Sequence, residues 1–156
     1  MFIIPCRRLV SVIMKDIEKA KTLLKEGNHA CVLCLDDMTF TSDANGIKPL
    51  NWWLRDGCRF EGFSAADRVV GKAAAYLYVL LGVKEVYAEV LSETAVPVLE
   101  RYGIAYSFGK KVKYIVNRTG DDLCPMEKIA LKHEEPEKAY EALKEKIAEL
   151  MAAKNN

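Results

Sequence analysis

The chain has 156 residues, of which 51% are hydrophobic and 29% are charged, and its formal net charge is +1. This length suffices to bury a hydrophobic core without disulfides or metal ions, and it predicts one domain. The near-neutral charge argues against a broad basic face for nucleic acid, while a local basic patch stays open. No apolar run approaches the roughly 20 residues that cross a bilayer, so no membrane partner is expected.

The N-terminal residues and the cysteines bear on location. Two arginines follow the short apolar start, which disfavours a secretory signal. We interpret residues 1–14 as an N-terminal extension and residues 15–152 as a single domain. The five cysteines follow no regular disulfide spacing, which indicates a reducing, cytoplasmic setting.

The first half of the domain predicts a helix, a hairpin and a second short helix. Apolar residues recur at helical spacing over residues 16–25. Residues 30–36 form an apolar, β-prone run, and with residues 39–41 they predict a β-hairpin. A short helix is expected around Trp52 and Trp53.

Residues 64–82 carry the strongest apolar pattern, SAADRVVGKAAAYLYVLLG, which we interpret as one central, buried helix. Ser64 and Asp67 fit a capping box at its start, and a direct catalytic role for Asp67 is the alternative. Arg68 and Lys72 would then share one helix face. That face is either a solvated stripe or, for Lys72, the wall of a pocket that meets an acidic ligand.

Strands and helices alternate through the second half of the chain, which predicts the α/β class. The expected elements are a strand over residues 83–91, a helix over 94–102, one or two strands over 105–116 broken near Gly109, and helices over 125–133 and 137–151.

A second helix start follows the strand over residues 83–91. Ser92 and Glu93 lie there, where open α/β sheets bind ligands, together with Thr94. Ordinary capping also explains Ser92 and Thr94.

A third helix start reads Cys124, Pro125, Met126, Glu127. Proline suits the first helical position, and Glu127 is placed to reach back toward the cap. Sulfur is a poor cap, so Cys124 is either a working thiol or a packing residue. His29 and His133 are the available bases, and His133 lies more than two turns from Cys124.

Cys31 and Cys34 form a C-x-x-C spacing on a predicted strand. Residues three apart on a strand point to opposite faces, so we interpret both as packing residues. The sequence contains neither a Walker phosphate loop nor a G-x-G-x-x-G fingerprint.

Several segments between residues 16 and 135 act together as a signature: GIKPL, DRVVGKAAA, VKEVYAEVLS followed by LERYGI, and NRTGDDLCPME. They resemble a prokaryotic family of domains of unknown function whose fold is that of cytidine deaminases. The resemblance implies a three-layer α/β/α sandwich with a mixed sheet of about five strands.

The resemblance also implies where zinc ligands would stand. Active deaminases place H-x-E or C-x-E at one helix start and P-C-x-x-C at the next. The matching positions here are Ala66 to Arg68 and Ser92 to Ala95, which lack every ligand, and Cys124 comes too late in the chain to replace them. We therefore expect no zinc and no other cofactor, and hydrolytic deamination is disfavoured.

Three hypotheses for function follow. The first is a zinc-free, deaminase-like domain that binds a small polar ligand such as a nucleoside or nucleotide, with Lys72 and Arg118 as anion contacts. The second is an enzyme with Cys124 as nucleophile or redox thiol, and the third is an interaction domain or homodimer that uses the tryptophan pair and the final helix. The candidate ligand contacts are Lys72, Arg68, Ser92, Glu93, Asn117, Arg118 and Glu127, and the catalytic candidates are Cys124 and Asp67.

Overall fold

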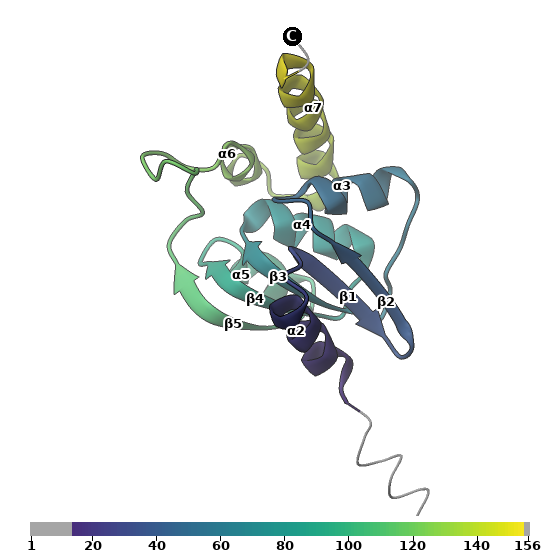
Figure 1. Ribbon diagram of the computed structural model, residues 1–156. Helices are drawn as coiled ribbons and strands as arrows, with labels where there is room; N and C mark the ends of the chain where they lie inside the picture. The colour runs from purple at the N-terminus through teal and green to yellow at the C-terminus, as the bar shows by residue number, and fades with distance from the viewer. Residues whose placement is uncertain (1–13, 155–156) are drawn as a thin grey trace, which may run out of the picture.

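The computed structural model describes residues 14–154, so the predicted N-terminal extension lies outside the described residues apart from Met14. The described chain forms a five-stranded mixed sheet with the strand order β2-β1-β3-β4-β5 (Figure 1). The strands are β1 (Cys31–Leu35), β2 (Met38–Ser42), β3 (Ser64–Val70), β4 (Glu85–Ser92) and β5 (Ala105–Val112). The pairs β3–β4 and β4–β5 are parallel, whereas β1 runs antiparallel to both β2 and β3.

Helices cover both faces of this sheet. They are α2 (Asp16–Glu26), α3 (Lys48–Arg55), α4 (Lys72–Leu81), α5 (Val96–Arg101), α6 (Pro125–Leu131) and α7 (Pro136–Lys154). One face is covered by α2, which packs on β1, β3 and β4. On the other face, α4 and α5 lie next to the sheet, and α3, α6 and α7 pack around α4 (Figure 1). The predicted α/β architecture with a mixed sheet of about five strands is confirmed.

Alternating residues of β1 divide the core between the two faces. Cys31 and Leu33 belong to the large cluster that contains α4, whereas Val32 and Cys34 belong to the smaller cluster under α2. The prediction that Cys31 and Cys34 point to opposite faces is therefore confirmed.

Most predicted elements are found. The first helix, the hairpin and the short tryptophan helix correspond to α2, to β1–β2 and to α3. Pro97 falls in the first turn of α5, where a missing N–H costs nothing. β5 is one strand that runs through Gly109, so the expected break there is absent from the described structure.

The prediction of one helix over residues 64–82 is wrong. Residues Ser64–Val70 form β3, a central strand paired with both β1 and β4, and the helix begins only at Lys72. A strand buried on both faces has the same continuous apolar character as a buried helix. Consequently Ser64 and Asp67 form no capping box, and Arg68 and Lys72 share no helix face.

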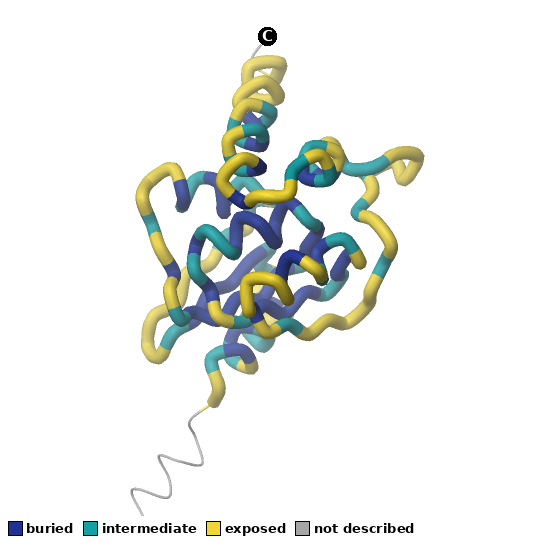
Figure 2. The backbone as a smooth tube through the Cα atoms, turned by 180° about the vertical axis from the view of Figure 1, so that it is seen from behind, coloured by how far each residue is buried: buried dark blue, intermediate teal, exposed yellow. Residues whose placement is uncertain are grey.

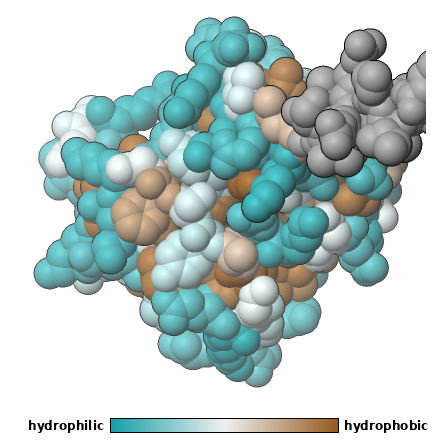
Figure 3. Space-filling view, turned by 90° about the horizontal axis from the view of Figure 1, so that it is seen from below, coloured by the Kyte–Doolittle hydropathy of each residue, from teal (hydrophilic) through white to brown (hydrophobic). Residues whose placement is uncertain are grey.

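The surface shows which parts of the molecule remain uncovered. The C-terminal half of α7 projects beyond the body, and the edge formed by β5 and the following loop is largely exposed (Figures 1 and 2). From below, the molecule is mainly hydrophilic with scattered hydrophobic areas (Figure 3). Within residues 14–154, no helix combines the length and apolar character that a membrane crossing requires.

Candidate functional site

The carboxyl ends of β3 and β4 lie side by side and each leads toward a helix. After β3 the chain passes Gly71 and enters α4 at Lys72, and after β4 it turns at Glu93 and Thr94 before α5. The two turns therefore lie next to each other at one edge of the sheet, on the face that carries α4 and α5.

Glu127 joins these two turns although it belongs to α6. Its side chain is almost fully buried, at 2% exposure. Glu127 Oε1 accepts hydrogen bonds from the backbone N–H of Lys72 at 2.9 Å and from Thr94 Oγ1 at 3.2 Å. The first N–H groups of a helix have no partner within it, so Glu127 caps α4. The expectation that Glu127 reaches back to its own helix start is wrong.

The ionisation of Glu127 is set by opposing effects. Burial raises the pKa of its carboxyl, while hydrogen bonds from the Lys72 amide and the Thr94 hydroxyl act to lower it. The hydroxyl chain continues to Ser92 Oγ, 2.7 Å from Thr94 Oγ1, and Ser92 Oγ accepts the N–H of Ala95. Buried Ser92 is thus a structural member of this network, as ordinary capping would have it.

A pocket of about 250 Å³ opens beside this network, between α4, α5 and α6. Its lining residues are Lys72, Tyr76, Thr94, Pro97, Val98, Arg101, Tyr102, Leu131 and Glu134. Two cations from different helices, Lys72 and Arg101, therefore face one cavity. Lys72 Nζ lies 5.6 Å from the centre of the Tyr76 ring, and Arg101 Nη1 donates to the Glu134 carbonyl at 3.0 Å.

Thr94 offers this pocket an acceptor. Its hydroxyl proton is directed to Glu127, so its remaining lone pair is the group available to a ligand. The Glu134 carboxylate adds a second acceptor to the lining. The pocket accordingly combines two cationic contacts with two acceptors.

Cys124 lies on a different, smaller cavity of about 90 Å³, whose lining includes Gly71, Ile115 and Glu127. It occupies the N-cap of α6 without a capping hydrogen bond from its sulfur. Its thiol is half-buried, and Glu127 stands between this cavity and the larger pocket.

Asp67 is buried in a polar cluster away from both cavities. Tyr78 Oη donates to Asp67 Oδ2 at 2.6 Å, and Cys31 Sγ lies 3.1 Å from Tyr78 Oη. Burial raises the pKa of Asp67 to about 6, although the Tyr78 hydroxyl and the Val69 amide act to lower it. Asp67 and Cys31 are paired across β3 and β1, so this cluster ties α4 to both strands.

Arg68 points to the opposite face of the sheet. Its guanidinium donates to both carboxylate oxygens of Glu89 at 2.9 Å and to the carbonyls of Leu24 and His29. It therefore holds the end of α2 and the following turn against the sheet, and it does not meet Lys72.

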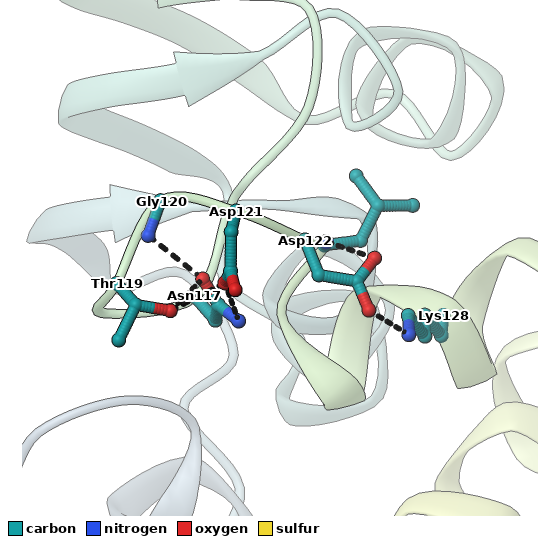
Figure 4. A network of polar contacts seen from close by, with 7 residues as sticks. Asn117, Thr119, Gly120, Asp121, Asp122 and Lys128 are labelled. Atoms are coloured by element: carbon teal, nitrogen blue, oxygen red, sulfur yellow. Dashed lines mark hydrogen bonds and ion pairs between the residues drawn. The ribbon is translucent and has the colours of Figure 1, made fainter.

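Asn117, a candidate ligand contact in the loop before α6, makes its side-chain hydrogen bonds within that loop. Asn117 Oδ1 accepts the Gly120 N–H at 2.8 Å, and Asn117 also bonds Thr119 and Asp121 (Figure 4). Asp122 is paired with Lys128, which fixes the loop to α6 (Figure 4). Exposed Arg118 and exposed Glu93 do not line the pocket.

Of the predicted contacts, Lys72 and Ser92 are thus joined to Glu127 in one network. The side chains of Arg68, Asn117, Arg118 and Glu93 do not join it. Sequence reasoning missed Arg101 and Glu134. Arg101 resembled an ordinary basic residue in the last turn of a helix, and its approach to Lys72 depends on how α5 lies beside α4.

Within residues 14–154, no group of three or more His, Cys, Asp or Glu side chains is placed to hold a metal ion.

Comparisons with known proteins give a family and a related structure. Residues 19–147 match the family described as TM1506, a domain of unknown function (DUF1893). The chain is also similar to the crystal structure of a DUF1893 family protein (TM1506) from Thermotoga maritima, with a TM-score of 0.78 and 24% sequence identity. The similarity covers 86% of this chain and 92% of the other, and at this identity it shows the fold alone. No match was found among curated proteins.

Proposed function

The chain belongs to the DUF1893 family of domains of unknown function, and on that premise we propose that it binds a small anionic ligand in the pocket between α4, α5 and α6. The observation that carries this proposal is the convergence of Lys72 and Arg101 on one cavity at the carboxyl ends of parallel strands. Cationic side chains from two helices offer an anion charge-assisted hydrogen bonds from two directions.

The same lining indicates the rest of the ligand. Thr94 Oγ1 and the Glu134 carboxylate present acceptors, so a fitting ligand carries hydroxyl or amino donors beside its anionic group. Tyr76 and Tyr102 supply aromatic walls. A nucleotide combines an anionic phosphate, hydroxyl and amino donors, and a base that can pack against aromatic side chains. A nucleoside has the donors and the base but lacks the phosphate. We therefore take a nucleotide as the first ligand to test.

Kinship with cytidine deaminases is part of the proposal. The succession of a parallel strand, a helix, a second strand and a second helix, β3-α4-β4-α5, supports it. The helix starts fall at Gly71–Lys72 and at Ala95–Val96, so the earlier alignment of Asp67 with a zinc-site helix start is wrong. Neither start contains a histidine or cysteine, and we propose binding without zinc-dependent deamination.

Thermal unfolding in the presence of ligands tests the proposal. A panel of nucleotides, nucleosides and inorganic phosphate is expected to contain at least one compound that raises Tm. Lys72→Ala and Arg101→Ala should each weaken its binding about 10-fold, the usual effect of losing one charge-assisted hydrogen bond. Lys138→Ala removes a charge from exposed α7 and serves as the matched control. A panel with no hit, or a hit that both pocket variants retain unchanged, would contradict the proposal.

The thiol alternative has one favourable observation. Cys124 lines the 90 Å³ cavity together with Glu127, which a nucleophile could use as a proton acceptor. Against it, His29 Nδ1 is engaged with Asp43 at 2.7 Å, and His133 lies beyond the far end of α6. We rank this alternative below ligand binding.

The interaction alternative is favoured by grooves beside α7. One groove of about 390 Å³ is lined mainly by apolar residues, among them Met126, Leu150 and Met151. Trp52 lines another on the α3 side, whereas Trp53 packs against Phe60 within the molecule. Sedimentation of the protein and of Leu150→Lys tests a homodimer, which the variant should dissociate.

A cytoplasmic location is proposed on the same footing. Cys31, Cys34, Cys58 and Cys124, the cysteines within residues 14–154, are all free thiols. Unpaired thiols suit a reducing compartment.

A further inference from the structure

An unusual run of residues follows the outer edge of the sheet. Residues 105–118 read AYSFGKKVKYIVNR, with four cationic side chains and no acidic residue, in a chain whose net charge is only +1. Aromatic side chains are interleaved with the cations. We call Phe108, Lys110, Lys111, Lys113, Tyr114 and Arg118 the β5 strip.

The β5 strip is open to solvent. β5 is an edge strand that pairs with β4, and all six residues of the strip are exposed. Phe108 and Tyr114 are 41% and 38% exposed, although phenylalanine has no polar group to favour such a position. From Phe108 to Val112 the strand covers about 13 Å, and the chain then bends at Lys113 and Tyr114.

At two points of the strip a lysine ammonium group lies near an aromatic ring. Lys111 Nζ lies 5.7 Å from the centre of the Phe108 ring, and Lys113 Nζ lies 5.8 Å from that of Tyr114. Each pair sets a cation beside an exposed aromatic surface. Three acids border the strip. Asp122 is paired with Lys128, Asp121 accepts hydrogen bonds from Asn117 and Thr119, and exposed Glu93 donates its backbone N–H to the Val112 carbonyl.

We propose that the β5 strip binds single-stranded nucleic acid without sequence preference. Unpaired bases can stack on Phe108 and Tyr114 while Lys110, Lys111, Lys113 and Arg118 contact the phosphates, which is the combination that single-strand binding requires. A duplex hides its bases and offers the rings nothing to stack on. The strip is separate from the small-ligand pocket, and none of its residues lines that pocket.

Fluorescence anisotropy with a labelled oligothymidine of about 12 nucleotides tests the proposal. Four phosphate contacts predict a slope of about −2.8 for log K against log salt, so affinity should fall about 50-fold from about 50 mM to about 200 mM salt. Lys111→Ala/Lys113→Ala should halve this slope. Phe108→Ala should lower the affinity about 5-fold or more with the slope unchanged, since it removes stacking and no charge.

Matched controls separate the strip from general charge. Lys138→Ala/Lys144→Ala removes two cations from α7 and is expected to leave oligonucleotide binding unchanged. Far-UV circular dichroism establishes that each variant is folded. No binding at about 50 mM salt, equal losses in the α7 and β5 double variants, or equal affinity for duplex and single strand would each overturn the proposal. So would binding of anionic phospholipid vesicles without binding of the oligonucleotide.

Discussion

Glu127 fills the space into which a side chain at Gly71 would project. A Cβ atom on Gly71 would overlap Glu127 Oε2 and would lie 2.8 Å from Ile115 Cγ1. The Gly71 backbone, with φ −100° and ψ −171°, is open to any residue. The glycine is therefore required by space and not by backbone conformation.

Gly71→Ala is expected to destabilise the protein by about 1–3 kcal/mol, the usual cost of overfilling a packed interior. Urea unfolding measures the change. Shortening the acid in Gly71→Ala/Glu127→Asp should recover part of the loss, because it withdraws the overlapping oxygen. An unchanged urea midpoint in Gly71→Ala would show that the carboxylate does not occupy this space.

Asp67 should make stability depend on pH in a defined direction. Its pKa is about 6 in the folded protein against an ordinary value of 3.8, so the folded state holds the proton more tightly. The stabilisation is complete below the ordinary value and is lost as pH rises through about 6. A difference of about two pKa units corresponds to about 3 kcal/mol.

Asp67→Asn removes this titration while it keeps an acceptor for Tyr78. The advantage of wild type over the variant should shrink by about 3 kcal/mol between about pH 3 and about pH 7 in urea unfolding. Tyr78→Phe, which deletes a hydroxyl that lowers the Asp67 pKa, should extend the loss to higher pH. Parallel stability curves for wild type and Asp67→Asn would refute the assignment.

Arg68 is expected to act on stability and not on ligand binding. Arg68→Ala removes the paired bonds to Glu89 and the bonds to two carbonyls near the end of α2, and should cost about 2–3 kcal/mol. Arg68→Lys should recover only part, because an ammonium lacks the guanidinium fork. Arg55→Ala breaks an exposed pair with Asp56 and is the control, with a cost of about 0–1 kcal/mol. A ligand affinity lost in Arg68→Ala would restore Arg68 as a contact.

Alkylation should divide the described cysteines into two groups. Cys31 and Cys34 are buried, and burial raises the pKa of both thiols, so they should react with iodoacetamide only when the protein unfolds. Cys58 and Cys124 are half-buried and should react first. Peptide mass spectrometry follows each site. A Cys124 rate well above that of the unfolded chain would favour the thiol alternative, whereas an equal or lower rate would remove its support.

Local patterns predicted most of the fold because they have local causes. The hairpin β1–β2 follows from an apolar, β-prone run, and the helix α2 follows from apolar residues at helical spacing. The prediction of a helix over Ser64–Val70 was wrong because this strand is covered on both faces. Such a strand has no alternation of polar and apolar residues that would distinguish it from a buried helix. Gly71 was the one local sign of the boundary.

The site was predicted less well, because its contacts join distant parts of the chain. Lys72 was found from its position near a helix start, but Glu127 bonds its amide across 55 residues, and no spacing rule reports such a contact. Arg101 enters the pocket through the packing of α5. Cys124 looked unusual as a cap, and its neighbour Glu127 proved to be the residue that organises the site.

The hydroxyl of Tyr78 fixes the position of helix α4 relative to the sheet. It is held by Asp67 on β3 and lies beside Cys31 on β1, so α4 has one position along the sheet. A slide by a single turn, about 5.4 Å, would leave the buried Asp67 carboxyl without this donor. Lys72 stands six residues earlier, about 9 Å along the same rigid rod. Its place in the pocket is thus set from the interior of the protein, and a ligand would meet a cation whose backbone is already in position.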